Sequence, residues 1–161
     1  MKNYAYLMSK KYLLKLFFVG ITLPLFSCQK SEEKKNVVVY YQKINERYLL
    51  PKGVEVNNLK QGIWIEYDST IGFIRTSTAY KNGIVEGDFI FYNPVGNGRI
   101  IQKGQCHIGK YNGLFECFNN NGTLSLKGHY LNNKRLGKWY EYDKNGKLTK
   151  VELWDKGYLV N

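Results

Sequence analysis

The sequence has few of the residues from which catalytic and metal sites are built. Its 161 residues include only three cysteines and two histidines. His107 and His129 are far apart in the chain, and neither sits in a close pattern such as C-x2-C that is typical of zinc sites. The sequence also lacks a G-x-S-x-G elbow, a P-loop and a dinucleotide-binding fingerprint. It therefore predicts no catalytic residues, no metal and no cofactor, and a protein that is not an enzyme.

The sequence also lacks an apolar run long enough to span a membrane. The longest mostly apolar run covers residues 16–26, and a helix of that length reaches only about 16 Å, half of the hydrocarbon core. Four lysines and no acidic residue precede it, and Ser27 and Cys28 follow it. A basic start, a short apolar segment and a small residue before a cleavage point are typical of a secretory signal peptide. We expect residues 1–27 to be such a peptide, in helical form.

The residues at this cleavage point, LFSC at 25–28, resemble the lipobox of bacterial lipoproteins. The resemblance implies a diacylglycerol thioether on Cys28 and a further acyl chain, such as palmitate, on its amine; two or more chains anchor a protein stably. The alternative is a plain signal peptide beside an unmodified cysteine. Residues 28–36 then form a flexible tether, and QKSEE at 29–33 resembles the export signal of some Bacteroidota surface lipoproteins. We expect a lipid anchor in the bacterial cell envelope, at the outer membrane, facing either the periplasm or the cell surface.

Acidic residues are scarce, with 13 Asp and Glu against 24 Lys and Arg and a net charge of +11. That excess shrinks to +7 without residues 1–27, and residues 62–161 carry +4. The charged fraction of 23% and the hydrophobic fraction of 43% exclude a disordered chain and a polytopic membrane protein. Eight basic residues between 127 and 156 suit an anionic lipid or glycan better than nucleic acid in an exported protein. The alternative is a solvated surface that confers solubility.

Glycine and aromatic residues are abundant, and they recur with a period of about 25 residues. Four copies of G-x-aromatic-x-x-aromatic start at Gly62, Gly87, Gly113 and Gly137, with spacings of 25, 26 and 24. Aromatic and β-branched residues favour strands, and the Asn and Gly that follow favour hairpin turns. Each copy therefore predicts a β-hairpin with its two aromatics on opposite faces. These aromatics, which are core residues or candidates for binding a partner, are Trp64, Tyr67, Phe89, Tyr92, Phe115, Phe118, Trp139 and Tyr142.

The full pattern, Y-x-N-G-x-x-x-G-x-[WF]-x-x-[YF], resembles the MORN-type repeat, and most closely its bacterial YwqK-like variant, whose members are catalogued as antitoxins. The resemblance covers residues 62–161 and departs from the pattern at Cys106 and Ile108, which replace Tyr and Asn. It implies an all-β fold, an elongated antiparallel sheet of tandem hairpins. Residues 37–61 are expected to be N-terminal strands or a degenerate capping repeat, with a turn at 51–53.

The remaining side chains leave several alternatives open. Cys106 and Cys117 fall on adjoining predicted strands of an exported protein, which permits a disulfide; free thiols are the alternative. Glu66 and Glu141 recur at one repeat position and indicate solvated strand sites. We expect a membrane-anchored, non-catalytic scaffold or binding module for a protein, or for an anionic glycan or lipid, and not for nucleic acid. The family resemblance alone suggests the alternative, an antitoxin or immunity-type inhibitor of a cognate toxin.

Overall fold

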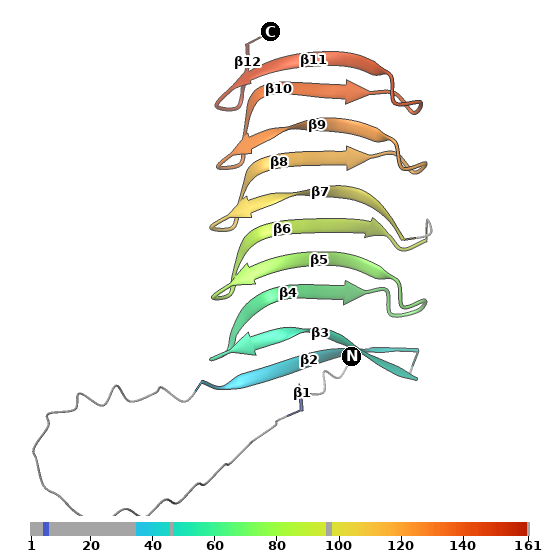
Figure 1. The fold of residues 1–161 in the computed structure, drawn as a ribbon, viewed down its shortest axis with the longest axis vertical. Coiled ribbons are helices and arrows are strands. Elements are labelled where there is room, and N and C mark those ends of the chain that lie inside the picture. Colours follow the sequence, from blue (N-terminus) through green and yellow to red (C-terminus); the bar gives the residue numbers. More distant parts are fainter. Residues whose placement is uncertain (1–4, 7–34, 46, 96–97, 161) are drawn as a thin grey trace, which may run out of the picture.

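The protein is one long antiparallel sheet in which every strand lies beside its neighbours in sequence (Figure 1). The computed structural model describes residues 5–6, 35–45, 47–95 and 98–160. The predicted all-β fold of tandem hairpins is confirmed, and the described residues contain no helix. The twelve strands are β1 (Ala5–Tyr6), β2 (Val37–Ile44), β3 (Tyr48–Val56), β4 (Leu59–Tyr67), β5 (Ile74–Lys81), β6 (Ile84–Asn93), β7 (Arg99–His107), β8 (Lys110–Phe118), β9 (Leu124–Leu131), β10 (Lys134–Tyr142), β11 (Leu148–Asp155) and β12 (Tyr158–Leu159).

The N-terminal part differs from expectation at two places. Ala5 and Tyr6 pair with β2 as a short strand rather than lying in a helix; the rest of residues 1–27, and Cys28, lie outside the described residues. The turn expected at 51–53 is also wrong, because these residues lie within β3. A bulge opposite Tyr40 and Tyr41 accommodates Pro51, since proline cannot donate to a regular ladder.

Each copy of the sequence motif is one hairpin. The short turns lie at one end of the strands and the long turns at the other end (Figure 1). The short turns have two residues, both with positive φ, as at Asn82 (51°) and Gly83 (79°). Such turns match the twist of the flanking strands. The second turn residue also donates to a carbonyl one hairpin earlier, at 2.9 Å from Gly83 N to Lys60 O and from Gly109 N to Val85 O. These hydrogen bonds thus link consecutive hairpins at the short-turn end of the strands.

Two of these turns carry a strained residue, Ile108 and Lys156. Ile108 has φ of 50°, and a left-handed conformation costs a residue other than Gly, Asn or Asp roughly 1–2 kcal/mol. We expect Ile108→Asn to raise the free energy of unfolding by about 1 kcal/mol, measured as a higher urea midpoint with an unchanged slope. The reverse change in the matching turn, Asn82→Ile, should lower it. A lower midpoint for Ile108→Asn would contradict the assignment of strain.

In the second, third and fourth hairpins, the glycine that opens the motif lies at a bulge in the first strand. Tyr80 pairs with Val85, and Thr78 pairs with Phe89. The chain therefore advances four residues along β6 where it advances two along β5. The extra residues are accommodated at Gly87, whose φ is 105°, a conformation that only glycine adopts readily. The register of β7 and β8 shifts in the same way around Gly113, whose φ is 114°. The motif glycine is therefore a backbone requirement.

The first aromatic of each motif forms the core on one face of the sheet, here called the inner face. Their exposed fractions are 5% for Trp64, 3% for Phe89, 8% for Phe115 and 1% for Trp139. Strand alternation places the second aromatics on the opposite, outer face, where they are half-buried. These outer-face aromatics are Tyr67, Tyr92, Phe118 and Tyr142.

Three strand glycines make room for the inner-face rings. A Cβ built on Gly53 would lie 2.5 Å from the Trp64 ring, and one on Gly104 would lie 2.7 Å from Phe89. Gly128 is covered in the same way by the Trp139 indole. None of the three glycines has a positive φ, so they are required by close packing and not by backbone conformation.

The disulfide considered for Cys106 and Cys117 does not form, and both thiols are free. On β7, Cys106 pairs with Tyr111, whereas Cys117 of β8 pairs with Gln102. The pairing position of Cys117 is therefore four residues along β7 from Cys106. That offset corresponds to about 13 Å along the strands, well beyond the Cα separation of roughly 7 Å that a disulfide tolerates.

Candidate functional site

Near the short turns, each hairpin adds two side chains to a row that crosses the inner face, here called the ring row. Adjacent members lie side by side because Val85 pairs with Tyr80, Cys106 with Tyr111 and Arg135 with Tyr130. The first strands contribute Lys60, Val85, Tyr111 and Arg135, and the second strands contribute Tyr80, Cys106, Tyr130 and Trp154.

In three of the four hairpins the ring row is filled by stacked side chains. The Lys60 ammonium lies 4.5 Å from the Trp64 ring centroid and 4.7 Å from that of Tyr80. Such cation–π contacts contribute about 0.5–1 kcal/mol at exposed sites. In the third hairpin Tyr111 takes the place of the cation, and its ring lies 5.7 Å from Phe115 and 5.4 Å from Tyr130.

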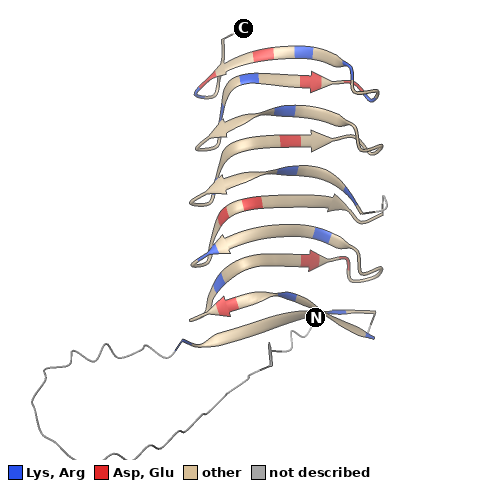
Figure 2. Cartoon of the chain, in the orientation of Figure 1, with Lys and Arg blue, Asp and Glu red and all other residues tan. Residues whose placement is uncertain are grey.

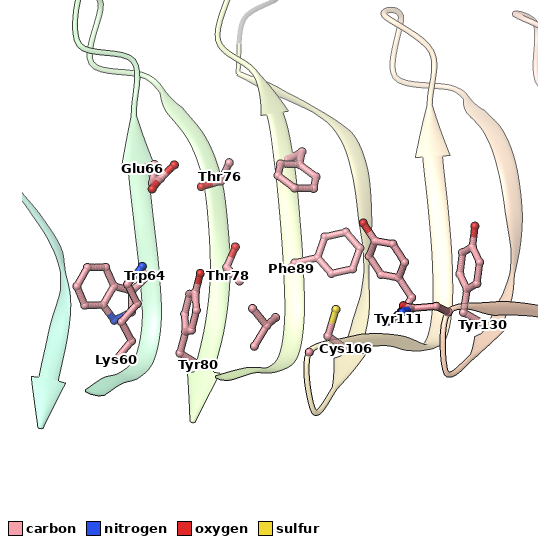
Figure 3. Close-up of a pocket in the computed structure, with 14 residues that line it drawn as sticks. Lys60, Trp64, Glu66, Thr76, Thr78, Tyr80, Phe89, Cys106, Tyr111 and Tyr130 are labelled. Atoms are coloured by element: carbon pink, nitrogen blue, oxygen red, sulfur yellow. Dashed lines mark hydrogen bonds between the residues drawn. The ribbon is translucent and has the colours of Figure 1, made fainter. Parts of the chain in front are cut away.

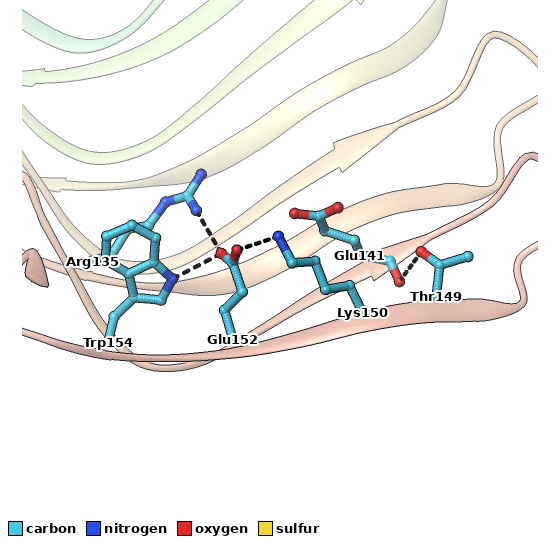
Figure 4. Close-up of polar contacts among 6 residues, drawn as sticks. All are labelled: Arg135, Glu141, Thr149, Lys150, Glu152 and Trp154. Atoms are coloured by element: carbon cyan, nitrogen blue, oxygen red, sulfur yellow. Dashed lines mark hydrogen bonds and ion pairs between the residues drawn. The ribbon is translucent and has the colours of Figure 1, made fainter. Parts of the chain in front are cut away.

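The last hairpin adds a carboxylate to this arrangement (Figure 4). The Arg135 guanidinium lies 4.2 Å from the Trp139 centroid and 4.9 Å from that of Trp154. Glu152 accepts a hydrogen bond from Arg135 at 3.3 Å and another from the Trp154 indole at 3.0 Å, and it pairs with Lys150. These donors hold the pKa of the Glu152 carboxyl below its ordinary value, with the Lys150 hydrogen bond as the largest cause. The C-terminal end of the ring row is thus fully occupied.

The second hairpin has small residues in both positions, and a groove opens there (Figure 3). Val85 stands where the other hairpins have Lys, Tyr or Arg, and Cys106 stands where they have Tyr or Trp. The groove has a volume of about 740 Å³. Tyr80 lies on one side of the opening, and Phe89 and Tyr111 lie on the other.

The rest of the groove is polar at its ends. Glu66, Thr76 and Thr78 line the end toward β4 and β5, and Asn133 lines the other end. Lys60 also belongs to the lining, but its ammonium is turned onto Trp64 and Tyr80. Aromatic faces with a few hydroxyl, amide and carboxylate groups can hold a ligand by stacking and hydrogen bonding.

Two of the groups that line the groove, the Cys106 thiol and the Tyr80 phenol, have a raised pKa. Burial, and then the charge of Glu86, raises the pKa of the Cys106 thiol. Burial, and then the charge of Glu66, raises the pKa of the Tyr80 phenol. Both groups therefore stay protonated and neutral near pH 7. In the part of the chain that the structure describes, no three His, Cys, Asp or Glu residues are grouped to hold a metal ion.

The outer face carries a separate charge cluster. Glu116 lies between Lys103, at 3.0 Å, and Lys127, at 3.3 Å. Burial alone would raise the pKa of the Glu116 carboxyl, but the two lysines together hold it below its ordinary value. The Lys103 ammonium also lies 5.6 Å from the Phe118 ring centroid. The cluster joins β7, β8 and β9 across the middle of the sheet.

This cluster predicts that acid destabilises the fold. Because the pKa of Glu116 is lower in the folded state, its stabilising contribution is complete above the unfolded pKa, near 4.5, and is lost as pH falls through the folded pKa. We expect urea midpoints to fall below that pH in the wild type, and Glu116→Gln to lose part of this slope. Equal pH slopes for the two proteins would contradict the prediction.

The residues expected from the sequence to bind a partner are divided among three places. Trp64 and Phe89 line the groove. Phe115 and Trp139 form the buried cluster together with Phe89, and the second aromatics lie on the outer face. Tyr80, Val85 and Tyr111 were not expected at a site. The only signal for them was the departure of Cys106 from the repeat pattern, because a smaller residue in a stacked row leaves space.

The expected basic surface between residues 127 and 156 is not one patch. Lys127 pairs with Glu116 on the outer face, whereas Arg135 and Lys150 pair with Glu152 on the inner face. Figure 2 shows acidic residues interleaved with basic ones along the sheet. Three of the eight basic residues are therefore paired with carboxylates, on two different faces of the sheet.

The described residues include no helix long and apolar enough to cross a membrane. No protein-family model, curated protein or solved structure matches the chain.

Proposed function

We propose that this chain is a membrane-anchored, non-catalytic lipoprotein of the MORN-repeat type. In this proposal its hairpin sheet is a binding module or scaffold for a protein or glycan partner at the bacterial cell envelope. The observation that carries the proposal is the aromatic groove at the second hairpin, since a concave, mostly apolar site with a few polar groups is the usual form of a binding site. The regular hairpins on either side give that site a rigid frame.

The lack of a poised acid, base or nucleophile supports a binding role over catalysis. The raised pKa values of Cys106 and Tyr80 leave the thiol without thiolate character and the phenol without basic character near pH 7. Glu66 is the one carboxylate among the groove residues that the structure describes. Acid–base hydrolysis of a glycan normally uses two.

The anchor is proposed on the lipobox and the polar tether. Acylation of Cys28 would attach the chain to the outer membrane, with residues 29–36 as the spacer. From there the sheet would face the periplasm or the cell surface, where a protein or an anionic glycan or lipid is within reach.

Crosslinking in intact cells tests the binding role, with mass spectrometry to identify what is captured. We expect a reproducible protein or glycan partner for the wild-type chain, and loss of that partner when Cys28→Ser releases the chain from the membrane. Capture of no partner by the anchored chain would overturn the binding role. Membrane retention of the Cys28→Ser variant would overturn the lipid anchor. A captured toxin that the chain inhibits would replace the scaffold role with an antitoxin role.

A further inference from the structure

The groove at the second hairpin lies where one aromatic ring is missing from an otherwise regular row. Position 106 corresponds to Tyr80, Tyr130 and Trp154 in the other hairpins. Tyr80 and Tyr130 contact the buried ring of their own hairpin, and Trp154 packs against the buried cluster. The centroid distances are 6.4 Å for Tyr80 to Trp64 and 5.1 Å for Tyr130 to Phe115. Phe89, the corresponding ring of the second hairpin, has the smaller side chain of Cys106 at this position, and it contacts Tyr111 of the next hairpin at 5.3 Å between centroids.

The gap has Tyr80 on one side and the Phe89–Tyr111 pair, whose ring centroids are 5.3 Å apart, on the other. Lys60 covers Tyr80 from the β4 side, whereas Val85 of β6 is the neighbour of Tyr80 on the other side. From β5 to β8 is three strand spacings, or about 14 Å. Where two neighbouring positions of the ring row both carry aromatic residues, as at Tyr111 and Tyr130, the ring centroids are 5.4 Å apart. Because the Tyr111 ring leans onto Phe89, the room for a further ring lies between Tyr80 and the Phe89–Tyr111 pair (Figure 3).

We propose that this gap binds an aromatic side chain, Trp or Tyr, presented by a partner polypeptide. The inference rests on the binding role proposed above and names the chemistry of the occupant. The protein itself shows which group fits, because three hairpins place an aromatic ring from a polypeptide strand at this position of the row. The groove is open along the sheet, as suits a side chain that arrives attached to a partner's backbone.

Energy and charge favour the same occupant. Trp and Tyr bury large apolar areas with little loss of rotamer freedom, and they dominate the energetic centres of protein interfaces. The Cys106 thiol at the floor is neutral, and sulfur packs favourably against ring edges. The polar groups at the ends of the groove, Thr78 and Asn133, can bond to a partner's backbone or to a Tyr hydroxyl or indole N–H.

The test is a methyl NMR titration of the full chain in phospholipid nanodiscs, read at Val85 in the floor of the gap. The probes are the capped tripeptides Ac-Gly-Trp-Gly-NH2, Ac-Gly-Leu-Gly-NH2 and Ac-Gly-Arg-Gly-NH2, with maltohexaose as a neutral glycan. We expect the Trp peptide to shift the Val85 methyl resonances upfield by its ring current. It should bind about two- to tenfold more tightly than the Leu peptide, the factor that aromatic pairing adds to area burial. Equal binding of the Leu peptide, or preference for the Arg peptide or the glycan, would overturn the proposal.

A variant that fills the gap gives the matched control. Cys106→Tyr restores the residue of the first and third hairpins, and we expect it to abolish the Val85 shift while raising Tm by about 2–4 °C. Cys106→Ala removes the thiol, leaves the gap open and should retain binding. A folded Cys106→Tyr protein that still binds the Trp peptide would overturn the proposal. If that variant does not fold, the wild-type titration decides alone.

The same variants separate this proposal from the general binding role. If Cys106→Tyr captures the same partner in cells as the wild type, the binding role stands and the gap is not the docking site. If neither protein captures a partner, the binding role itself is wrong.

Discussion

Replacing Trp139 with alanine is expected to lower the free energy of unfolding by about 3–5 kcal/mol. Its side chain is 1% exposed, the most buried of the described large residues. The indole contacts Tyr130 at 4.9 Å and Phe115 at 6.0 Å between centroids, and it supports the Arg135 guanidinium. Removing it would leave a cavity at the junction of the third and fourth hairpins. Urea denaturation followed by far-UV circular dichroism measures the loss.

Trp139→Phe is the matched control. Phe89 and Phe115 occupy the same column of the repeat, so the site accepts a phenyl ring. The Trp139 indole N–H is also buried and finds no hydrogen-bond partner among the described residues. Removing this unsatisfied donor offsets part of the stability that is lost with the smaller ring. We expect a loss below about 1.5 kcal/mol. A Phe variant as unstable as the Ala variant would show that the ring contacts are not the source of stability.

The second large effect is expected at Gly128, which lies beneath the same indole. A methyl group there would enter the space of the Trp139 ring, and the ring is too enclosed to move away without disturbing its neighbours. We expect Gly128→Ala to lower the free energy of unfolding by about 1–3 kcal/mol, the usual cost of overpacking. Because φ at Gly128 is not positive, backbone strain does not contribute to this cost.

A double-mutant cycle separates the clash from any other effect of the substitution. In a Trp139→Ala background the ring is absent, and Gly128→Ala should then cost at least about 1 kcal/mol less than in the wild type. The measurement is again the urea midpoint and slope. Additive losses in the cycle would mean that the glycine is needed for a reason other than the indole above it.

The hairpins were predictable because the repeat period, the turn residues and the alternation along the strands all indicate the same structure. The Gly-aromatic period sets the repeat length, and Asn and Gly at the turns fix where each strand ends, as at Asn82 and Gly83. The aromatic at Trp64 and the one at Tyr67 also alternate as a pleated strand requires. Local chemistry and tertiary pairing agree because every strand pairs only with its neighbours in sequence.

The site was less predictable because it depends on side chains from separate hairpins. The gap at Cys106 exists only in relation to Tyr80 and Tyr111, which belong to different copies of the repeat. Gly53 and Gly128 gave no sequence signal, since a strand glycine matters only when the ring above it is known. Pro51 was assigned to a turn because proline usually interrupts strands, and the bulge in β3 that accommodates it is a property of the pairing with β2.

The strictly sequential order of the strands also determines how the molecule would respond to force. A load applied between the two ends of the sheet meets the hydrogen bonds of one terminal strand at a time, because no later strand returns to clamp an earlier one. The sheet would therefore unzip hairpin by hairpin at low force and would not shear as a block. Each repeat of about 25 residues would release roughly 85 Å of extended chain. A partner held in the groove would be tethered by an extensible ladder, and the fourth hairpin, β10 and β11, would be free to peel away before the strands that line the groove.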